Sequence, residues 1–309
     1  MRVYEFAKNY DMTSKEIVGI CHEIGIEVKA QSKLDEKQLA ALSRHICRGK
    51  DTVEVIDTEH DLNGAKSMVY IVTECEPFTS LGELGKTAAK FVRETVEEER
   101  SLIVVLPKYQ EITDAYGLEL EKLMEFPLKV GKKEVQASIY QFIQDSVIYL
   151  LIGNEEYFSR EDIYGYEDDI ERFTFFNRAV LEALPRLETE ITSLYVNDWN
   201  TSLIPLILNV DYKYHEFYQG VETTLNIHNL EYQGWCTVDH LPNIIGISRQ
   251  YYDNGLTRMG DAVNLLKSGI ETATHLQLSR QCMQQLELPQ LTESGMASVI
   301  ERKLNHKAS

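Results

Sequence analysis

The sequence predicts an α/β protein: a doubly wound parallel sheet with a small all-helical N-terminal domain. Three observations favour this class. From about residue 67 onward, short and almost continuously apolar segments alternate with helical segments, which is typical of parallel strands covered on both faces. Before residue 47, the apolar residues follow helical spacing alone. The 309 residues also suffice for one large and one small domain.

The charge of the chain excludes some partners. The net charge of −18 disfavours binding to nucleic acid or to an anionic membrane, because phosphate binding needs a basic face. The first 50 residues carry 9 basic and 7 acidic residues, which leaves 22 and 42 for the rest, so a nearly neutral head precedes an acidic body. No apolar run reaches the roughly 18–20 residues that span a bilayer, and the N-terminus lacks a signal-peptide core. We therefore expect a cytoplasmic protein with no membrane contact.

The cysteines indicate neither a disulfide framework nor a zinc site. They are odd in number, far apart and never in a C-x-x-C pair: Cys21, Cys47, Cys75, Cys236 and Cys282. Reduced thiols are the expectation, and no metal or cofactor is predicted.

The head, residues 1–46, is predicted to contain three short helices. Thr13 and Glu16 have the spacing of a capping box, and Gly25 is placed to end the helix that they begin. Apolar residues follow that cap at helical spacing: Ile17, Ile20, Cys21 and Ile24. A later stripe consists of Leu39, Leu42 and Ile46, and an opening helix contains Val3, Tyr4 and Phe6. Residues 47–66 are polar and acidic, which is typical of a linker.

The body, residues 67–309, is predicted to form one sheet. The strand candidates are Met68–Val72, Leu102–Leu106, Val147–Ile152, Ser193–Val196, Thr223–Ile227 and His275–Leu278. The clearest helices lie at Ile170–Leu184 and Asp261–Thr272. Ligands of such sheets bind outside the carboxyl ends of the strands, so the residues just after each strand are the candidates for function.

The opening of the head resembles the N-terminal module of bacterial translation initiation factor two. The resemblance runs from Met1-Arg2-Val3-Tyr4-Glu5-Phe6 through Thr13-Ser14-Lys15-Glu16 to Gly25-Ile26-Glu27-Val28-Lys29. It implies a small docking domain that contacts another protein rather than a catalytic one.

The loop after the first strand resembles a glycine loop of bacterial glycogen and starch synthases, E-x-x-P-x-x-K-x-G-G-L-x-D. Four positions match, at Glu74, Pro77, Gly82 and Leu84. The family's Lys, second Gly and Asp are replaced by Ser80, Glu83 and Lys86. In the family this loop approaches the diphosphate of ADP-glucose, so Gly82 is a candidate for substrate binding. A carboxylate at position 83 opposes a phosphate there, and tight packing is an equally open role for the glycines.

The segment from Tyr164-Gly165-Tyr166-Glu167-Asp168-Asp169 to Phe175-Phe176-Asn177-Arg178 carries the most specific resemblance to the same family. The resemblance places Asp168 on the acceptor-sugar side of the cleft. A structural role is equally open, because acidic residues are favoured at the start of a helix.

Two further strand ends match the family. Tyr195-Val196-Asn197-Asp198-Trp199-Asn200-Thr201 resembles H-x-H-D-W-H-[TA], with all three His positions replaced. The middle His contacts the transferred glucose in the family, and Asn197 stands there. Ile227-His228-Asn229-Leu230-Glu231-Tyr232-Gln233-Gly234 matches T-[IV]-H-N-L-x-Y-Q-G almost completely. These motifs make Asp198, Trp199, His228, Asn229 and Gln233 candidates for sugar contact, with capping and packing as the alternative roles.

The resemblance covers about residues 67–303 and implies one Rossmann-like lobe of a GT-B glycosyltransferase. In the family a donor-binding lobe follows this point, and we expect this chain to lack it. We therefore expect a non-catalytic homologue that binds α-glucan or a partner, and no catalytic residue is assigned. Two alternatives are an active ADP-glucose-dependent glucosyltransferase completed by a separate chain, and a docking protein that acts through its head.

Overall fold

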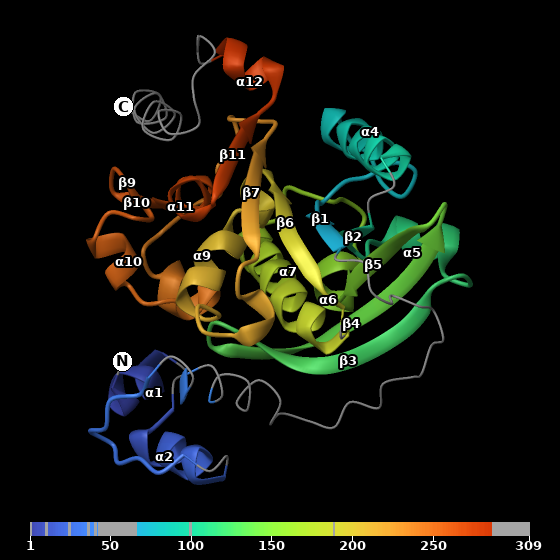
Figure 1. Cartoon of the computed structure of the whole chain (residues 1–309). Helices are drawn as coiled ribbons and strands as arrows, with labels where there is room; N and C mark the ends of the chain where they lie inside the picture. The colour runs from blue at the N-terminus through green and yellow to red at the C-terminus, as the bar shows by residue number, and fades with distance from the viewer. Residues whose placement is uncertain are drawn as a thin grey trace. The chain divides into compact units, whose positions relative to one another are not determined.

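The computed structural model describes residues 2–9, 12–23, 26–35, 38–39, 42, 67–98, 101–187 and 189–285 (Figure 1). These residues fall into two compact units. One comprises the described part of residues 1–53 together with 207–220, and the other comprises the described part of 54–206 and 221–309. Each unit is considered by itself.

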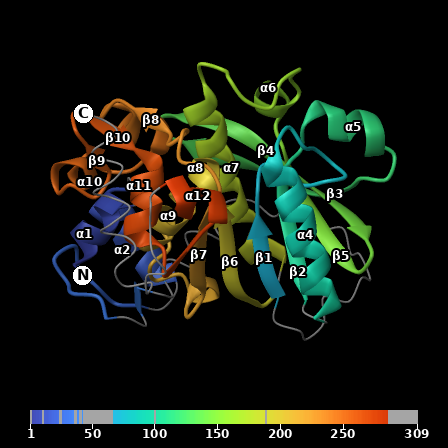
Figure 2. The ribbon, with the colours of Figure 1, turned by 90° about the horizontal axis from the view of Figure 1, so that it is seen from above.

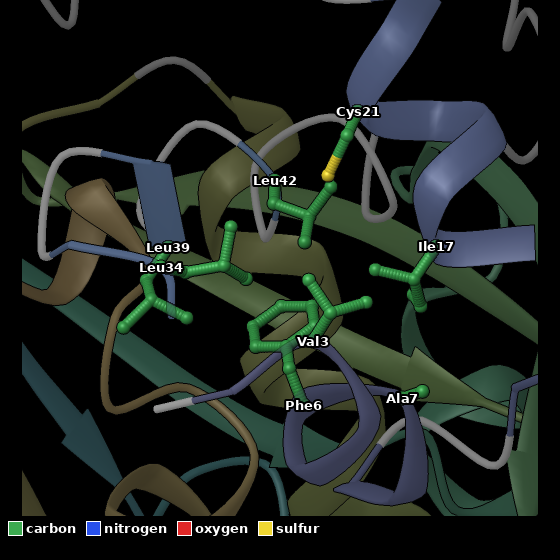
Figure 3. Packing of buried hydrophobic residues seen from close by; sticks show 8 residues of the cluster. All are labelled: Val3, Phe6, Ala7, Ile17, Cys21, Leu34, Leu39 and Leu42. Atoms are coloured by element: carbon green, nitrogen blue, oxygen red, sulfur yellow. The ribbon is translucent and has the colours of Figure 1, made fainter. Parts of the chain in front are cut away.

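The head contains α1 (Val3–Asn9) and α2 (Ser14–Glu23). The predicted capping box is present, because Thr13 N donates to Glu16 Oε2 at 2.7 Å and Glu16 N donates to Thr13 Oγ1 at 3.3 Å. Figure 3 shows the apolar core of the head, whose members come from both helices and from the segment after them: Val3, Phe6, Ala7, Ile17, Cys21, Leu34, Leu39 and Leu42. The predictions for Ile24, Gly25, Ile46 and the linker 47–66 lie outside the described residues.

One eight-stranded sheet organises the larger unit. Its strands, in spatial order, are β11 (His275–Leu278), β7 (Glu222–Ile227), β6 (Ile191–Asn197), β1 (Ser67–Ile71), β2 (Leu102–Pro107), β5 (Val147–Gly153), β4 (Lys133–Gln144) and β3 (Glu121–Val130). The six strands from β11 to β5 run parallel, as predicted. All six predicted strands are therefore confirmed, with ends that shift by one or two residues.

The sheet also contains an antiparallel part, which was not predicted from the sequence. The strands β3 and β4 form an antiparallel hairpin beside β5. Their buried and exposed residues alternate because the hairpin has one solvated face, and this pattern differs from the continuously apolar runs used to find the other strands. A small second sheet, β8 (Trp235–Cys236), β10 (Ala262–Asn264) and β9 (Arg258–Met259), was not predicted either.

Helices cover both faces of the large sheet. The helices described after β1 are α4 (Glu83–Glu97), α5 (Gln110–Tyr116), α6 (Glu155–Phe158), α7 (Asp169–Ala183), α8 (Asp198–Thr201), α9 (Leu203–Val210), α10 (Gln250–Asp253), α11 (Leu265–Thr272) and α12 (Arg280–Gln285). The end of α9 belongs to residues 207–220 of the first unit. Short 3₁₀ turns lie at Leu184–Leu187 and Glu216–Tyr218, and a π-helical turn at Leu241–Ile245. In the view of Figure 2, α4 and α7 lie on opposite sides of the strands.

Of the two predicted helices, one is confirmed and the other begins later than predicted. The prediction for residues 170–184 is confirmed by α7. The helix predicted from Asp261 begins only at Leu265, because residues 262–264 pair with the small sheet. The Asn264 side chain ends that strand and caps α11, accepting from Lys267 N at 2.8 Å.

Candidate functional site

The direction of the strand order reverses between β1 and β6, so the loops that follow these two parallel strands lie at the same edge of the sheet. The chain moves from β1 to β2 and β5 on one side, and returns through α7 to β6 on the other side of β1. This reversal is the switch point at which doubly wound sheets bind ligands. Both β1 and β6 are followed by motifs that the sequence singles out, so the topology brings these motifs to one place.

Asn197 is the centre of a buried hydrogen-bond network at this point. Its Nδ2 donates to Ile71 O at 2.9 Å. Its Oδ1 accepts from Tyr70 Oη at 3.0 Å and from Asn226 Nδ2 at 3.3 Å, and lies 3.0 Å from His228 Nε2. Because the amide nitrogen is fixed by Ile71, the oxygen faces the imidazole and Nε2 is the donor.

Asn197, the position at which the resemblance implies a glucose contact, is thus buried in this chain. Asn197 has no exposed surface, and both ends of its amide are engaged. It serves to hold β1, β6 and β7 together at their carboxyl ends. This arrangement leaves a ligand nothing to bind on the Asn197 side chain.

Asp198 follows Asn197 in the chain and is hydrogen-bonded to two other predicted site residues. Its Oδ1 accepts from the backbone N–H of His228 at 2.7 Å and of Asn229 at 3.1 Å. The residue is only 6% exposed and has φ of +55°, a backbone conformation that is rare for a residue other than glycine. Burial raises the pKa of the Asp198 carboxyl, while the His228 side chain and the two N–H donors oppose that rise.

Trp199 packs against the loop that follows β7. Its ring meets Phe173 edge to face with centroids 5.4 Å apart. Gly234 has φ of +65°, and a Cβ there would lie 2.6 Å from Trp199 Cε3. The indole is half-buried, so it both packs the loop and keeps part of its surface outside the core.

Two other predicted residues have different surroundings. Gln233 is buried, and its amide is engaged at both ends: Oε1 accepts from Asn264 Nδ2 at 2.7 Å and Nε2 donates to Leu230 O at 2.8 Å. Asn229 is exposed and caps its own turn, with Oδ1 accepting from Glu231 N at 2.7 Å. Gln233 therefore fixes the loop, whereas Asn229 is accessible.

Gly82 is the N-cap of α4. The carboxylate of Glu74 binds backbone amides of the loop that contains it. Glu74 Oε2 accepts from Leu81 N at 2.7 Å and from Gly82 N at 3.2 Å. The other oxygen of Glu74 accepts from Tyr164 Oη at 2.8 Å. Two of the amides just before this helix are thus occupied by a carboxylate of the chain itself.

Glu83 and Lys86 form an ion pair at the same helix start. Lys86 Nζ lies 3.1 Å from Glu83 Oε1, and both side chains are exposed. Glu83 lies in the first turn of α4, where the helix dipole favours a carboxylate. A diphosphate approaching this turn would meet the Glu83 carboxylate as well as the Lys86 ammonium.

Asp168 directly precedes α7, and its carboxylate is bound by the guanidinium group of Arg160. Arg160 donates to both of its carboxylate oxygens at 2.7 Å, and this hydrogen bonding holds the pKa of Asp168 below its usual range. Arg160 also lies over the ring of Tyr166, 4.8 Å from its centroid. The Asp168 side chain is 37% exposed, so its remaining lone pairs face solvent.

Sequence reasoning did not assign Arg160, Tyr164 or Asn264 to this region. Tyr164 lies within a quoted motif, and its role follows only from the contacts with Thr73 and Glu74. Arg160 lies outside every matched motif, and its pairing depends on the fold of the loop before α7. Among the described residues no cluster of His, Cys, Asp or Glu is arranged to hold a metal ion. Within the same part of the chain, no helix is both long and apolar enough to span a membrane.

Comparison with known proteins gives two family matches. Residues 67–302 match the starch synthase catalytic domain, and residues 1–47 match the N-terminal region of translation initiation factor IF-2. A glycogen synthase of Clostridioides difficile is 36% identical over 208 residues, which is 66% of this chain and 43% of that protein. A glycogen synthase of Desulforamulus reducens is 33% identical over 242 residues, 77% of this chain and 50% of that protein.

A solved structure shows the same fold. The catalytic domain of starch synthase IV from Arabidopsis thaliana, bound to ADP and acarbose, superposes with a TM-score of 0.63 at 21% identity. The match covers 79% of this chain and 50% of that one. The chain thus spans about half the length of the relatives that it matches.

Proposed function

The chain belongs to the starch synthase catalytic domain family, and from this we propose that its larger unit binds α-glucan at the carboxyl ends of β6 and β7 without transferring glucose itself. The observation that carries the proposal is the start of α4. Glu74, which the family pattern shares, occupies the Leu81 and Gly82 amides, and Glu83 adds a carboxylate that the pattern lacks. A sugar-nucleotide diphosphate is disfavoured there, whereas an uncharged glucan is not.

The accessible polar groups suit sugar hydroxyls. Asn229 is exposed, and Asp168 is partly exposed although Arg160 holds it in place. Amide and carboxylate groups give directional hydrogen bonds, and the partly exposed Trp199 offers an apolar ring face. Binding at an exposed surface orders a flexible glucan without burying it, so we expect a dissociation constant in roughly the micromolar to millimolar range.

Calorimetry on the purified chain tests this proposal. We expect weak binding of maltoheptaose, weaker binding of ADP-glucose, and no incorporation of labelled glucose from ADP-glucose into glycogen. The combined change Ser80→Lys and Glu83→Gly restores the family residues at the start of α4 and is expected to tighten ADP-glucose binding without changing maltoheptaose binding, because only the charged ligand responds to the removed carboxylate.

The control is Asp168→Ala, which retains the start of α4 but removes a proposed sugar contact. Glucose incorporation by the pure chain above the level of this variant would contradict the non-catalytic function and favour the active-transferase alternative. The absence of any maltoheptaose binding would contradict the glucan-binding function.

A further inference from the structure

The segment that follows β7 carries two exposed aromatic side chains. Tyr232 is 67% exposed and Trp235 is 41% exposed. Among the described residues, the other large apolar side chains with comparable exposure are Tyr4, Leu81, Leu118 and Ile143. Isolated exposed apolar residues are ordinary. Tyr232 and Trp235 differ because both are aromatic and lie only three positions apart, in the loop before β8 and at the first residue of β8.

Hydrogen bonds of two buried polar residues, Gln233 and Asn264, anchor this loop. Gln233, between the two aromatics, is fixed by Asn264 at 2.7 Å and by Leu230 O at 2.8 Å. Its carbonyl and that of Gly234 accept from the first two amides of α11, Leu266 N at 3.1 Å and Leu265 N at 3.2 Å. The loop is therefore anchored to the helix start by both backbone and side chain. Aromatic rings on such a loop lose little further freedom when a ligand binds.

The loop begins at the candidate site. Asp198 holds the backbone N–H groups of His228 and Asn229, and Trp199 backs the loop at Gly234. A chain-like ligand that contacts Asn229 would therefore meet this loop as its path continues toward β8. Because this loop continues from the candidate site to β8, the arrangement favours a ligand with several repeating units over a small one.

The chemistry of the surface selects among possible ligands. Aromatic side chains present ~150–250 Å² each, so the exposed parts of these two leave on the order of 200 Å², whereas a stable protein interface needs ~800 Å² on each partner. A protein partner is thus poorly supported by this area. The neighbouring Glu231 is exposed and disfavours an anionic ligand. The apolar faces of sugar rings suit exposed aromatic rings, and their hydroxyls suit the polar groups around them.

We propose that Tyr232 and Trp235 form a platform on which an α-glucan stacks, extending the strand-end site toward β8. This inference rests on the proposed glucan-binding function. The platform supplies ring contacts, while Asn229 and Asp168 supply hydrogen bonds. Stacking of this kind is sequence-independent along a repeating polymer, so the platform favours longer oligosaccharides over short ones.

Substitution in the full chain tests the platform. Tyr232→Ala and Trp235→Ala are each expected to weaken maltoheptaose binding about three- to tenfold in calorimetry, the range that corresponds to one aromatic contact. Tyr4→Ala is the matched control, because Tyr4 is an exposed tyrosine in the head and its removal is expected to change nothing. The conservative variant Trp235→Phe retains a ring and is expected to keep most of the affinity.

A fluorescence measurement gives an independent result. The chain has two tryptophans, Trp199 and Trp235. Acrylamide quenching of Trp235 is expected to fall when maltoheptaose is added, and Trp235→Phe is expected to reduce that change to the part contributed by Trp199. If the wild type binds maltoheptaose but both alanine variants bind equally well, the platform is wrong and the proposed function stands. If the wild type does not bind maltoheptaose, the proposed function itself fails. An effect of the variants on self-association alone would assign the rings to a protein contact and overturn the platform.

Discussion

Asp198 shows how one residue combines an unusual backbone with a buried charge. Its φ of +55° turns the chain sharply after β6, and its carboxylate then receives two N–H groups from the segment after β7. Conformations of this kind cost on the order of 1–3 kcal/mol and persist where the surrounding structure fixes them. Aspartate is among the residues that tolerate positive φ best. The residue thus links the two strand ends that carry the proposed sugar site.

The raised pKa of Asp198 predicts a defined pH dependence. Burial makes the folded protein hold this proton more tightly than the unfolded chain does. Between the unfolded pKa of about 3.9 and the higher folded pKa, the folded state binds more protons, so the contribution to stability falls as pH rises through that window and is fully present below it. Asp198→Asn keeps the tolerance of positive φ and one acceptor oxygen but cannot titrate. We expect the wild type to gain stability relative to Asp198→Asn when pH falls from 7 toward 4.

Urea unfolding of both proteins at pH 7, 5, 4 and 3 measures this difference, and the other titrating groups cancel when the two are compared. Asp168→Asn is the opposite control. Arg160 lowers the pKa of Asp168, so its contribution is present above the unfolded pKa and is lost as pH falls through the folded pKa. The wild type should therefore lose stability relative to Asp168→Asn on acidification. The same sign for both variants would contradict the assignment.

The hairpin of β3 and β4 is the element that most changes the expected sheet. Its turn lies against the π-helical turn at Leu241–Ile245, and Lys132 N donates to Asn243 O at 3.0 Å. Gly131 has φ of +56°, and a Cβ there would lie 2.0 Å from Asn243 O. The glycine is thus required both for its backbone conformation and for the close approach of the two segments.

Gly131→Ala is expected to destabilise the larger unit by several kcal/mol, because the methyl group meets backbone that cannot move aside without breaking the Lys132 contact. Gly260→Ala is the matched control. Its φ of +58° is nearly the same, but nothing lies within 4 Å of the added Cβ, so only the conformational cost, on the order of 1 kcal/mol, is expected. Thermal or urea unfolding measures both variants. Equal losses would show that the contact with Asn243 is unimportant.

The elements differ in how far the sequence could predict them, for physical reasons. The six parallel strands are buried on both faces, so their composition alone reveals them. The hairpin strands alternate buried and exposed residues, and they were missed. At the site, the motifs located Asp198 and Asn229 correctly at strand ends, but the burial of Asn197 depends on Tyr70 and Asn226, which come from other strands. Such a network exists only in three dimensions, and a linear pattern does not encode it.

At the scale of the whole molecule, the chain joins a nearly neutral head to an acidic body. The two family matches end and begin at residues 47 and 67. We propose that residues 47–66, which lie outside the described part of the chain, are a linker between units that fold separately. The buried residues of the apolar core all lie between positions 3 and 42, with Tyr214 of the same unit packed against them. The head also has its own capped helix, and both features support this organisation.

Limited proteolysis tests this boundary. A protease specific for glutamate has sites at Glu54 and Glu59, and we expect the first cuts there, followed by a stable fragment that begins near residue 60. Glu134, an exposed residue near the hairpin turn, is the internal control, because strand pairing should protect it. Mass spectrometry identifies the fragments. Early cuts inside both units with residues 47–66 intact would contradict the linker.

The hairpin has a further consequence for the behaviour of the protein at high concentration. Strand β3 is an outer edge of the large sheet, and such edges invite pairing with a second molecule. Pro127 lies within this strand and cannot donate a backbone hydrogen bond. Charged side chains are exposed along it: Glu121, Lys122, Glu125 and Lys129. A neighbouring copy would thus find an interrupted ladder and a row of exposed charged side chains, so this edge strand resists aggregation by strand addition.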